Sequence, residues 1–265
     1  MIYPTACGRL VLGGNTVEDQ DAGTASYIEY LPYKGDTITL YDGAEWIEVV
    51  FANPSVSVVG EAAGQNYDVF CYLSGGAPAL EILQWTNDTT RATALTRQDG
   101  VLVKSGDATR LFLGTIRTSD SSEVADQTYQ RLIWNTYNRL VRTLYSSSNW
   151  AVLHSYTTSA WRSWNNDTTL GLARYECVIG QPQTAFCDYT VYVKCSGGVY
   201  FSTNISGSGL LLPGSRARAT SGITSTRSKA VLLPEGYSSF QLEENGQAAG
   251  STSWQSMWQV ATLEF

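Results

Sequence analysis

The chain has 265 residues, of which 43% are hydrophobic and only 15% are charged, well below the ~25% charged share of an average globular protein. Its formal net charge of −7 argues against a nucleic-acid partner, because contacts to phosphates need clustered Lys and Arg. No stretch approaches the ~20 apolar residues of a membrane-spanning helix, and the first residues do not resemble a secretion signal. We therefore expect synthesis in a cytoplasm and no membrane insertion.

The composition indicates a mainly β protein, because Gly, Ser and Thr supply turns while the 16 Tyr and 8 Trp favour strands. The first 30 residues are polar and Gly-rich after the short run Arg9–Leu12. Two interpretations stay open for this segment: an arm that docks on a neighbour, or an edge strand followed by a loop.

A hairpin is predicted next. Residues 37–41 and 45–50 alternate between apolar and polar, and Asp42-Gly43 stands between them. An Asp-Gly pair between alternating runs favours a type I′ turn, in which both central residues have φ > 0.

Further strands follow at the short spacing of a β-sandwich, separated by turn-forming linkers. The first group is predicted over residues 67–73, 80–85, 92–96, 101–104 and 110–117. The second is predicted over residues 150–156, 170–179, 185–195, 199–205, 229–233, 238–243 and 257–265. About eight strands from Arg110 onward match the number in a jelly roll. We divide the chain into an N-terminal β-domain with a docking arm (residues 1–108) and a jelly-roll-like β-sandwich (residues 109–265).

One segment departs from the β pattern. Between Ala125 and Val141, apolar side chains recur with the three-four spacing of one helical face, and Ser and Asp residues before it offer N-caps. This spacing predicts one short amphipathic helix. The competing interpretation is a strand, since Trp, Tyr and Thr are poor helix formers.

Enzyme signatures are missing from the sequence: it has no nucleophile elbow, no P-loop and no zinc-binding helix motif. The single histidine, His154, lacks companion motifs and is interpreted as a satisfied core or cleft residue. No metal or cofactor is expected. The five cysteines are interpreted as buried, inert thiols: Cys7, Cys71, Cys177, Cys187 and Cys195.

Two features keep ligand chemistry open. Trp161, Arg162 and Trp164 lie in an apparent loop, where aromatic faces and a guanidinium suit stacking on sugars. The plainer interpretation is that one indole fills the core and the other packs beneath a loop. A pair of carboxylates would suffice for a glycosidase, although Asp residues beside turns commonly bond their own backbone.

A set of ordered motifs runs through the first half of the chain, over residues 32–36, 41–46, 67–70, 85–91, 99–106, 113–116 and, most strongly, 133–139. A fainter continuation follows after residue 230, at Gly236-Tyr237, Gln241 and Glu243. These motifs, which cover roughly residues 30–145, resemble a family of tailed-bacteriophage virion proteins described as head-decoration, head-fibre or tail-fibre proteins.

The resemblance implies a β-rich component of the virion surface, a homotrimer that contacts other virion proteins such as capsid or tail proteins, with no catalytic residue. A receptor-binding fibre needs a shaft with repeats or heptads, which this sequence lacks, so capsid decoration or a head fibre is favoured. The alternatives are a tail fibre or spike that recognises a host surface glycan and, with lower weight, a glycan depolymerase. Trp134, Tyr137 and Arg139 are the candidate subunit contact.

Overall fold

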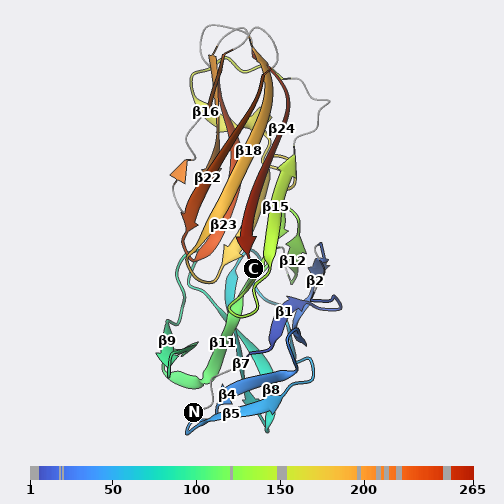
Figure 1. Ribbon diagram of the computed structural model, residues 1–265, viewed down its shortest axis with the longest axis vertical. Helices are drawn as coiled ribbons and strands as arrows, with labels where there is room; N and C mark the ends of the chain where they lie inside the picture. The colour runs from blue at the N-terminus through green and yellow to red at the C-terminus, as the bar shows by residue number, and fades with distance from the viewer. Residues whose placement is uncertain are drawn as a thin grey trace.

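The computed structural model describes residues 6–265 except 18, 20, 120–121, 148–153, 196–197, 207–209, 212–214, 219–222 and 247–251. The described chain is built of β-strands with a single turn of 3-10 helix, η1 (Trp164–Asn166), which confirms the mainly β prediction. The molecule is elongated, with the N-terminal strands at one end and the C-terminal strands at the other (Figure 1). In the described part, no helix has the length and apolar character needed to cross a membrane.

The N-terminal end combines a hairpin and two small sheets. A three-stranded sheet has the order β1-β3-β6, and a hairpin joins β4 to β5. A six-stranded sheet has the order β8-β7-β11-β10-β9, with β14 on β11. Their bounds are β1 (Gly8–Leu12), β3 (Tyr27–Pro32), β4 (Thr37–Tyr41), β5 (Trp46–Val50), β6 (Ser55–Ser57), β7 (Asn66–Ser74), β8 (Ala77–Gln84), β9 (Leu95–Gln98), β10 (Val101–Lys104), β11 (Asp107–Arg117) and β14 (Ile133–Asn135).

The C-terminal end is a jelly roll. One sheet has the order β15-β24-β18-β22, and the other contains the run β17-β23-β19 followed by β20 and β21. Counting β20 and β21 as one strand, the chain order is 1-8-3-6 in the first sheet and 2-7-4-5 in the second, all antiparallel. This interleaving of two Greek keys defines the jelly roll. The bounds are β15 (Val141–Ser147), β17 (Arg174–Ile179), β18 (Gln183–Cys195), β19 (Gly198–Ile205), β20 (Leu210–Leu211), β21 (Ser215–Arg218), β22 (Ile223–Leu233), β23 (Gly236–Gly246) and β24 (Thr252–Glu264).

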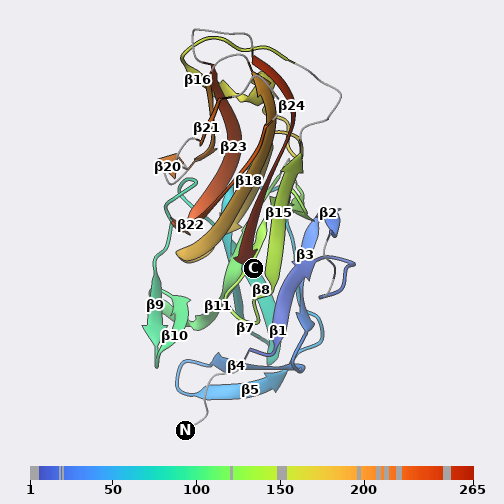
Figure 2. The same ribbon diagram turned by 45° about the horizontal axis from the view of Figure 1, so that its top comes forward.

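Alternation of side chains explains why these strands form a sandwich. In β18, Ala185 and Cys187 are buried between the sheets while Phe186 and Asp188 point outward. The strands of the first sheet run side by side along the long axis (Figure 2). The inner side chains of the two sheets meet in one core, in which the second sheet contributes the large apolar residues Tyr175, Phe201 and Phe240. Full burial of an apolar side chain of this size stabilises the fold by ~1.5–3 kcal/mol.

The second sheet of the jelly roll is extended toward the N-terminal part by β2 (Gly23–Ala25), β12 (Val124–Gln127) and β13 (Gln130–Arg131). The predicted boundary at residue 108 falls at the start of β11, which pairs with β7 and β10 before it and β14 after it. Phe112 and Trp134 also pack into the jelly-roll core. Strand pairing and packing thus cross this position, and the division into two domains stays a prediction.

One arginine side chain, that of Arg91, joins the two ends of the molecule. Arg91 donates from Nε to Asp68 Oδ2 (2.8 Å) in β7, pairs with Glu235 between β22 and β23, and donates to the Gly180 carbonyl. Its guanidinium lies 4.3 Å from the ring centroid of Trp85. Nearby, the Tyr237 N–H donates to the Asp88 carbonyl (2.9 Å).

The predicted helix between residues 125 and 141 is wrong. The segment forms β12, β13 and β14 and leads into β15, so the strand interpretation holds. Residues 130–135 are all buried, because these short strands are covered on both sides. Consecutive burial of this kind leaves no polar helical face, and the apolar spacing that imitated a helix comes from packing into both cores.

The hairpin is confirmed, but its predicted type I′ turn is wrong. Tyr41 pairs with Trp46, so four residues connect the strands, and only Gly43 among them has positive φ (110°). Asp42 Oδ1 accepts the N–H groups of Ala44 (2.8 Å) and Glu45 (2.9 Å) instead. These backbone bonds lower the pKa of Asp42.

The structure also bears on the predictions for the N-terminal segment, for residues 150–156 and for the cysteines. Residues 8–12 form the edge strand β1 rather than a free arm, whereas residues 1–5 lie outside the described residues. The strand predicted over 150–156 falls largely on residues outside the description, and Tyr156 lies in no strand. Cys71, Cys177 and Cys187 are buried free thiols as expected, Cys7 is half-buried and free, and the side chain of Cys195 is outside the description.

Substituting the turn glycine tests the hairpin. Gly43→Val is expected to lower the free energy of unfolding by about 1–3 kcal/mol, because a β-branched residue resists positive φ. The neighbouring exposed Ala44→Val, at ordinary φ, is the control and should change it by less than ~0.5 kcal/mol. Urea unfolding measures both, and equal effects for the two variants would contradict the turn geometry.

Candidate functional site

The tryptophan-rich segment folds against the jelly roll at the end remote from the N-terminal sheets (Figure 1). Trp161, Arg162 and Ser163 form β16 (Trp161–Ser163), which pairs antiparallel with Asn245, Glu244 and Glu243 of β23. Trp164 begins η1 directly afterwards, and Asn165 within that turn has positive φ (51°). The pairing with β23 places Arg162 directly opposite Glu244.

Glu244 is the centre of the segment's polar contacts and is 0% exposed. Its Oε1 accepts hydrogen bonds from Arg162 Nε (2.7 Å) and from the Asn165 N–H (3.2 Å). Its Oε2 lies 2.6 Å from Nε2 of His154, whose ring meets Trp164 edge-on at 4.7 Å. His154 is thus the partner of a buried carboxylate through Nε2.

The two tryptophans separate into different environments. Trp164 is buried in the jelly-roll core, whereas Trp161 is 40% exposed. Between them, the Arg162 guanidinium lies 3.8 Å from the ring centroid of Tyr156, so charge and aromatic faces adjoin the exposed indole. This geometry offers Trp161 as a stacking surface for a flat apolar ring face, such as that of a sugar, and leaves Trp164 as a core residue.

Four of the carboxylates, at Glu244, Glu243, Asp107 and Asp68, are bound by other groups of the protein. Glu244 has both oxygens engaged, and its neighbour Glu243 accepts Asn204 Nδ2 (3.0 Å) from the opposite face of β23. Asp107 Oδ1 accepts the Thr109 N–H (3.1 Å), as expected for an Asp beside a turn. Asp68 is instead buried against Arg91, and its burial raises its pKa.

The candidate subunit contact needs correction at Trp134. Its side chain is 1% exposed, stacks on Phe112 at 6.4 Å, and donates from Nε1 to Gln183 Oε1 (3.2 Å). Tyr137 is half-buried, and only Arg139 is exposed, with its guanidinium 5.5 Å from the Trp134 ring centroid. Trp134 belongs to the core because β14 is packed on both sides, so it does not present a surface to another subunit.

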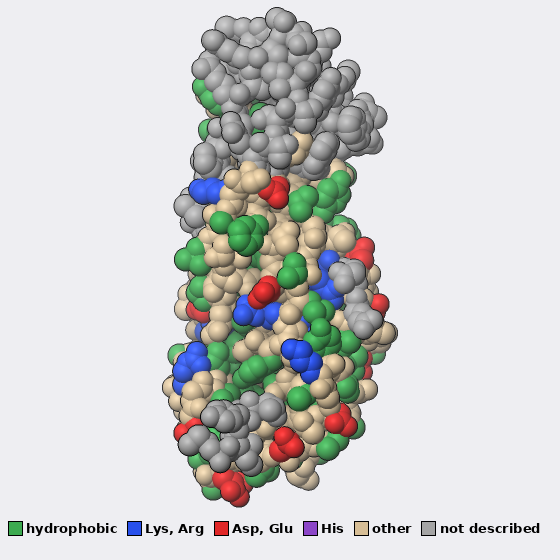
Figure 3. All heavy atoms as spheres, in the orientation of Figure 1, with side chains coloured by type: hydrophobic (Ala, Val, Ile, Leu, Met, Phe, Trp, Pro, Cys, Tyr) green, Lys and Arg blue, Asp and Glu red, His purple; other side chains and the backbone are tan. Residues whose placement is uncertain are grey.

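Arg139 nevertheless borders an apolar surface that the sequence reading missed. Val141, Phe186 and Leu232 are 62–64% exposed and lie on the outer face of the sheet β15-β24-β18-β22. We call these three residues the outer patch. Hydrophobic side chains are visible on this face beside charged ones (Figure 3). A signal existed in the sequence, since Ala185, Phe186 and Cys187 are apolar on both faces of one strand.

An open groove of about 460 Å³ runs along this surface, lined by Arg139, Val141, Pro182, Gln183, Thr184, Phe186, Thr262, Leu263 and Glu264. Arg139 and Glu264 form a weak ion pair at its rim (3.8 Å). Both signs of charge and apolar side chains are therefore present within one surface, a combination typical of protein interfaces.

Comparisons with known proteins give only weak structural likenesses. No family model and no curated protein matches the sequence. Dimeric latent PorU from Porphyromonas gingivalis has TM-score 0.34 at 8% identity, covering 77% of this chain and 20% of that one. A structure of infectious bursal disease virus Gx strain has TM-score 0.30 at 12% identity, covering 98% of this chain and 68% of that one. The structure of BuGH86wt in complex with neoagarooctaose has TM-score 0.28 at 8% identity, covering 90% of this chain and 34% of that one. Similarity at this level assigns neither family nor function.

Removing the buried carboxylate tests the role assigned to Glu244. Glu244→Ala is expected to lower the free energy of unfolding by about 3–5 kcal/mol, because Arg162 and His154 lose their partner in a buried site.

The adjacent Glu243→Ala serves as the control and should lower the free energy of unfolding by at most about 1 kcal/mol. Chemical denaturation measures both. Equal, small effects would show that the Glu244 contacts do not hold this segment in place.

Proposed function

We propose that the protein is a non-catalytic structural component of the exterior of a bacteriophage virion, a capsid decoration (cement) or head-fibre protein that assembles as a homotrimer. The motif resemblance over residues 30–145 supports the virion assignment. Jelly rolls occur in viral capsid and lectin domains, and this analogy at the level of the fold is compatible with the same role.

The observation that carries the proposal is the outer patch. Three large apolar side chains that are more than half exposed on one sheet face mark an interaction surface, since monomeric proteins seldom gather such residues. The occupant we infer is a second copy of the chain. Arg139 and Glu264 at the rim let each copy offer both a cation and an anion to its neighbour.

The edges of the same sheet support this choice. β15 and β22 are its two edge strands, and edge strands must be covered or blunted to avoid uncontrolled pairing. If three copies pack around one axis, with the outer patch of each against the next copy, this sheet face is covered. The edge strands then lie beside a neighbouring copy and are less open to uncontrolled pairing.

A second function is supported by a different observation. Trp161, with the Arg162–Tyr156 stack beside it, forms an exposed aromatic surface at the tip of the jelly roll. A tail fibre or spike that recognises a host surface glycan would use such a surface. Trp161→Ala is expected to abolish binding to purified host surface polysaccharide, whereas Tyr27→Ala, of similar exposure, should not alter it. Equal binding by wild type and Trp161→Ala would exclude this site.

Charged substitutions in the outer patch test self-association. Phe186→Asp with Leu232→Asp is expected to raise the dissociation constant of the assembly by ~100-fold or more, because each buried anchor contributes about 2 kcal/mol. Sedimentation and light scattering should give a wild-type mass three times the 28.9 kDa of one chain, and a monomer for the variant.

The matched control is Val59→Asp, a residue of similar exposure that lies away from this sheet. It should leave the assembly intact, and far-UV circular dichroism should show that all variants stay folded. A wild-type protein that remains monomeric at every concentration, or a double variant that still assembles, would contradict the proposed interface.

A further inference from the structure

The hairpin of β4 and β5 has one open edge. β5 lies at the N-terminal extremity of the molecule, beside β4 (Figure 2). In the described part of the chain, β4 is the strand with which β5 pairs, and the other edge of β5 meets no strand. The open edge of a strand presents backbone N–H and C=O groups that can pair with a further strand.

Hydrogen bonds at the two ends of the hairpin fix which backbone groups face β4. At the turn, the Asp42 N–H donates to the Glu45 carbonyl (3.0 Å). At the other end, the Phe51 N–H donates to the Asp36 carbonyl (2.9 Å). In an antiparallel ladder, hydrogen-bonded pairs alternate with pairs that make no backbone bond, so every second residue of β5 faces away from β4.

The register assigns the residues of β5 to these two sets. Ile47 and Val49 form the backbone bonds with β4. The N–H and C=O groups of Trp46, Glu48 and Val50 therefore point to the open edge. None of these groups has a hydrogen-bond partner among the described residues.

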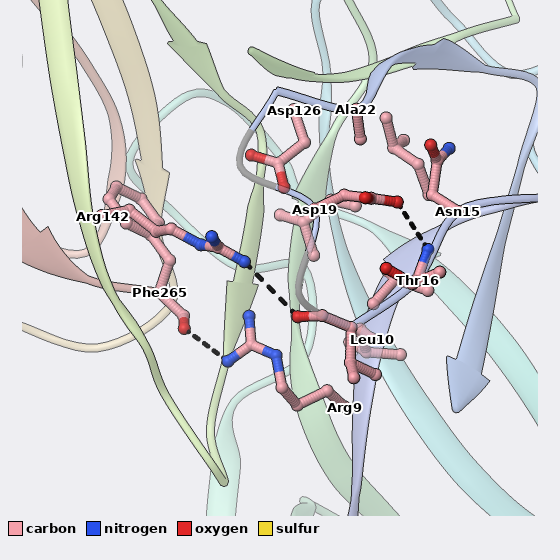
Figure 4. A pocket seen from close by; sticks show the side chains of 13 residues that line it. Arg9, Leu10, Asn15, Thr16, Asp19, Ala22, Asp126, Arg142 and Phe265 are labelled. Atoms are coloured by element: carbon pink, nitrogen blue, oxygen red, sulfur yellow. Dashed lines mark hydrogen bonds between the residues drawn. The ribbon is translucent and has the colours of Figure 1, made fainter. Parts of the chain in front are cut away.

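The edge strand β1, in the same end of the molecule, is closed by contrast. The Leu10 N–H donates to Asn135 Oδ1 (2.7 Å), and Asn135 Nδ2 donates to the Leu10 carbonyl (3.2 Å), so one side-chain amide replaces a neighbouring strand. The adjoining Arg9 donates from Nη1 to the Phe265 carbonyl (2.9 Å; Figure 4). The fold thus covers the edge of β1 and leaves that of β5 available.

The side chains along the open edge alternate in chemistry. Trp46, Glu48 and Val50 share one face of β5, since side chains two residues apart point the same way. Val50 is 66% exposed and Glu48 is exposed, whereas Trp46 is half-buried. The indole Nε1 of Trp46 donates to Asp99 Oδ2 (3.0 Å), which holds the ring in place. An added strand would meet an apolar, an anionic and an apolar side chain in turn.

The charge around this edge selects the occupant. Asp36, Asp42 and Glu45 are exposed at the ends of the hairpin, and Glu48 lies on β5 itself. None of these four carboxylates forms an ion pair within the described residues. Acidic side chains are visible at this end of the molecule (Figure 3). Antiparallel pairing with β5 of a second copy, centred on this edge, would oppose the two Glu48 carboxylates, which is unfavourable. A cationic strand meets no such repulsion.

We propose that the open edge of β5 binds an extended cationic segment of another protein by strand addition. Main-chain hydrogen bonds supply the affinity in this mode of recognition, and alternate side chains supply the specificity. The segment places Lys or Arg opposite Glu48 and apolar residues opposite Trp46 and Val50. This surface lies at the end of the molecule remote from β16 and is separate from the outer patch, so the inference does not rest on the proposed function (Figure 1).

Hydrogen exchange of the full chain tests whether the edge is open. The amides of Trp46, Glu48 and Val50 should exchange faster than those of Ile47 and Val49 by about tenfold or more, because only the latter are bonded to β4. Equal protection of both sets in the free protein would mean that the edge is already covered, and would overturn the proposal.

Capped peptides at millimolar concentration are the probe for binding. Thr-Val-Thr-Lys-Thr-Val-Thr should shift the NMR signals of the Trp46, Glu48 and Val50 amides and slow their exchange. Replacing Lys by Glu should weaken binding by about fivefold or more, because a like charge then faces Glu48. Replacing both Val by Pro keeps the charge but removes two N–H donors, and should abolish binding. No shift with the Lys peptide, or equal binding of the Pro peptide, would refute strand addition.

Reversing the charge on the strand supplies the matched test. Glu48→Lys should invert the preference, so that the Glu peptide binds more tightly than the Lys peptide. Glu123→Lys changes an exposed residue between β11 and β12 and should keep the wild-type preference. Far-UV circular dichroism shows that each variant is folded. A preference that is the same in the wild type and in Glu48→Lys would contradict the assigned contact.

Discussion

The buried Arg91 side chain is the interaction on which the arrangement of the two ends depends. It binds Asp68 in the N-terminal sheet, Glu235 between two jelly-roll strands, and the Gly180 carbonyl, while its plane covers Trp85. Thr115 donates to the other oxygen of Asp68 (2.9 Å), which fixes the carboxylate that receives the guanidinium. Separating Arg91 from Asp68 would leave two buried charges unpaired, which is strongly unfavourable and so disfavours other orientations of the two ends.

With the two ends joined in this way, the molecule is elongated (Figure 1). The jelly roll projects from the N-terminal sheets (Figure 1). In the proposed roles, the outer patch is suited to contacts between copies, and the exposed indole of Trp161 is suited to a ligand from outside. For a surface component of a particle, such separation allows assembly and recognition to proceed without interfering.

The strands were predictable because their signals are local. Alternation and turn residues located β7, β10, β18 and β19 to within a few residues. The predicted count of eight strands from Arg110 onward agrees with a jelly roll only in number, because it includes β11, which pairs in the N-terminal sheet, and omits β15. The segment around Leu132 was misread because its burial comes from two cores that the sequence does not show. Likewise, nothing local distinguishes Trp161 from Trp164; the pairing of β16 with β23 does so.

The contacts of the candidate site could not be predicted from the sequence, because they join segments that are distant in the chain. His154 and Arg162 bind Glu244, which lies more than 80 positions away in the chain. Residues such as Arg142, within an alternating strand, read as surface charges until the direction of each face is known.

The proposed role as a multi-copy component of a virion surface is tested most directly by the composition of bacteriophage particles. Quantitative mass spectrometry of particles purified from cells that produce this protein counts its copies, with the major capsid protein as the internal reference. A capsid-decoration role predicts hundreds of copies per particle in a fixed ratio to the capsid protein, whereas a few dozen or fewer would indicate a fibre or spike. Absence of the protein from purified particles, despite its presence in infected cells, would contradict the account.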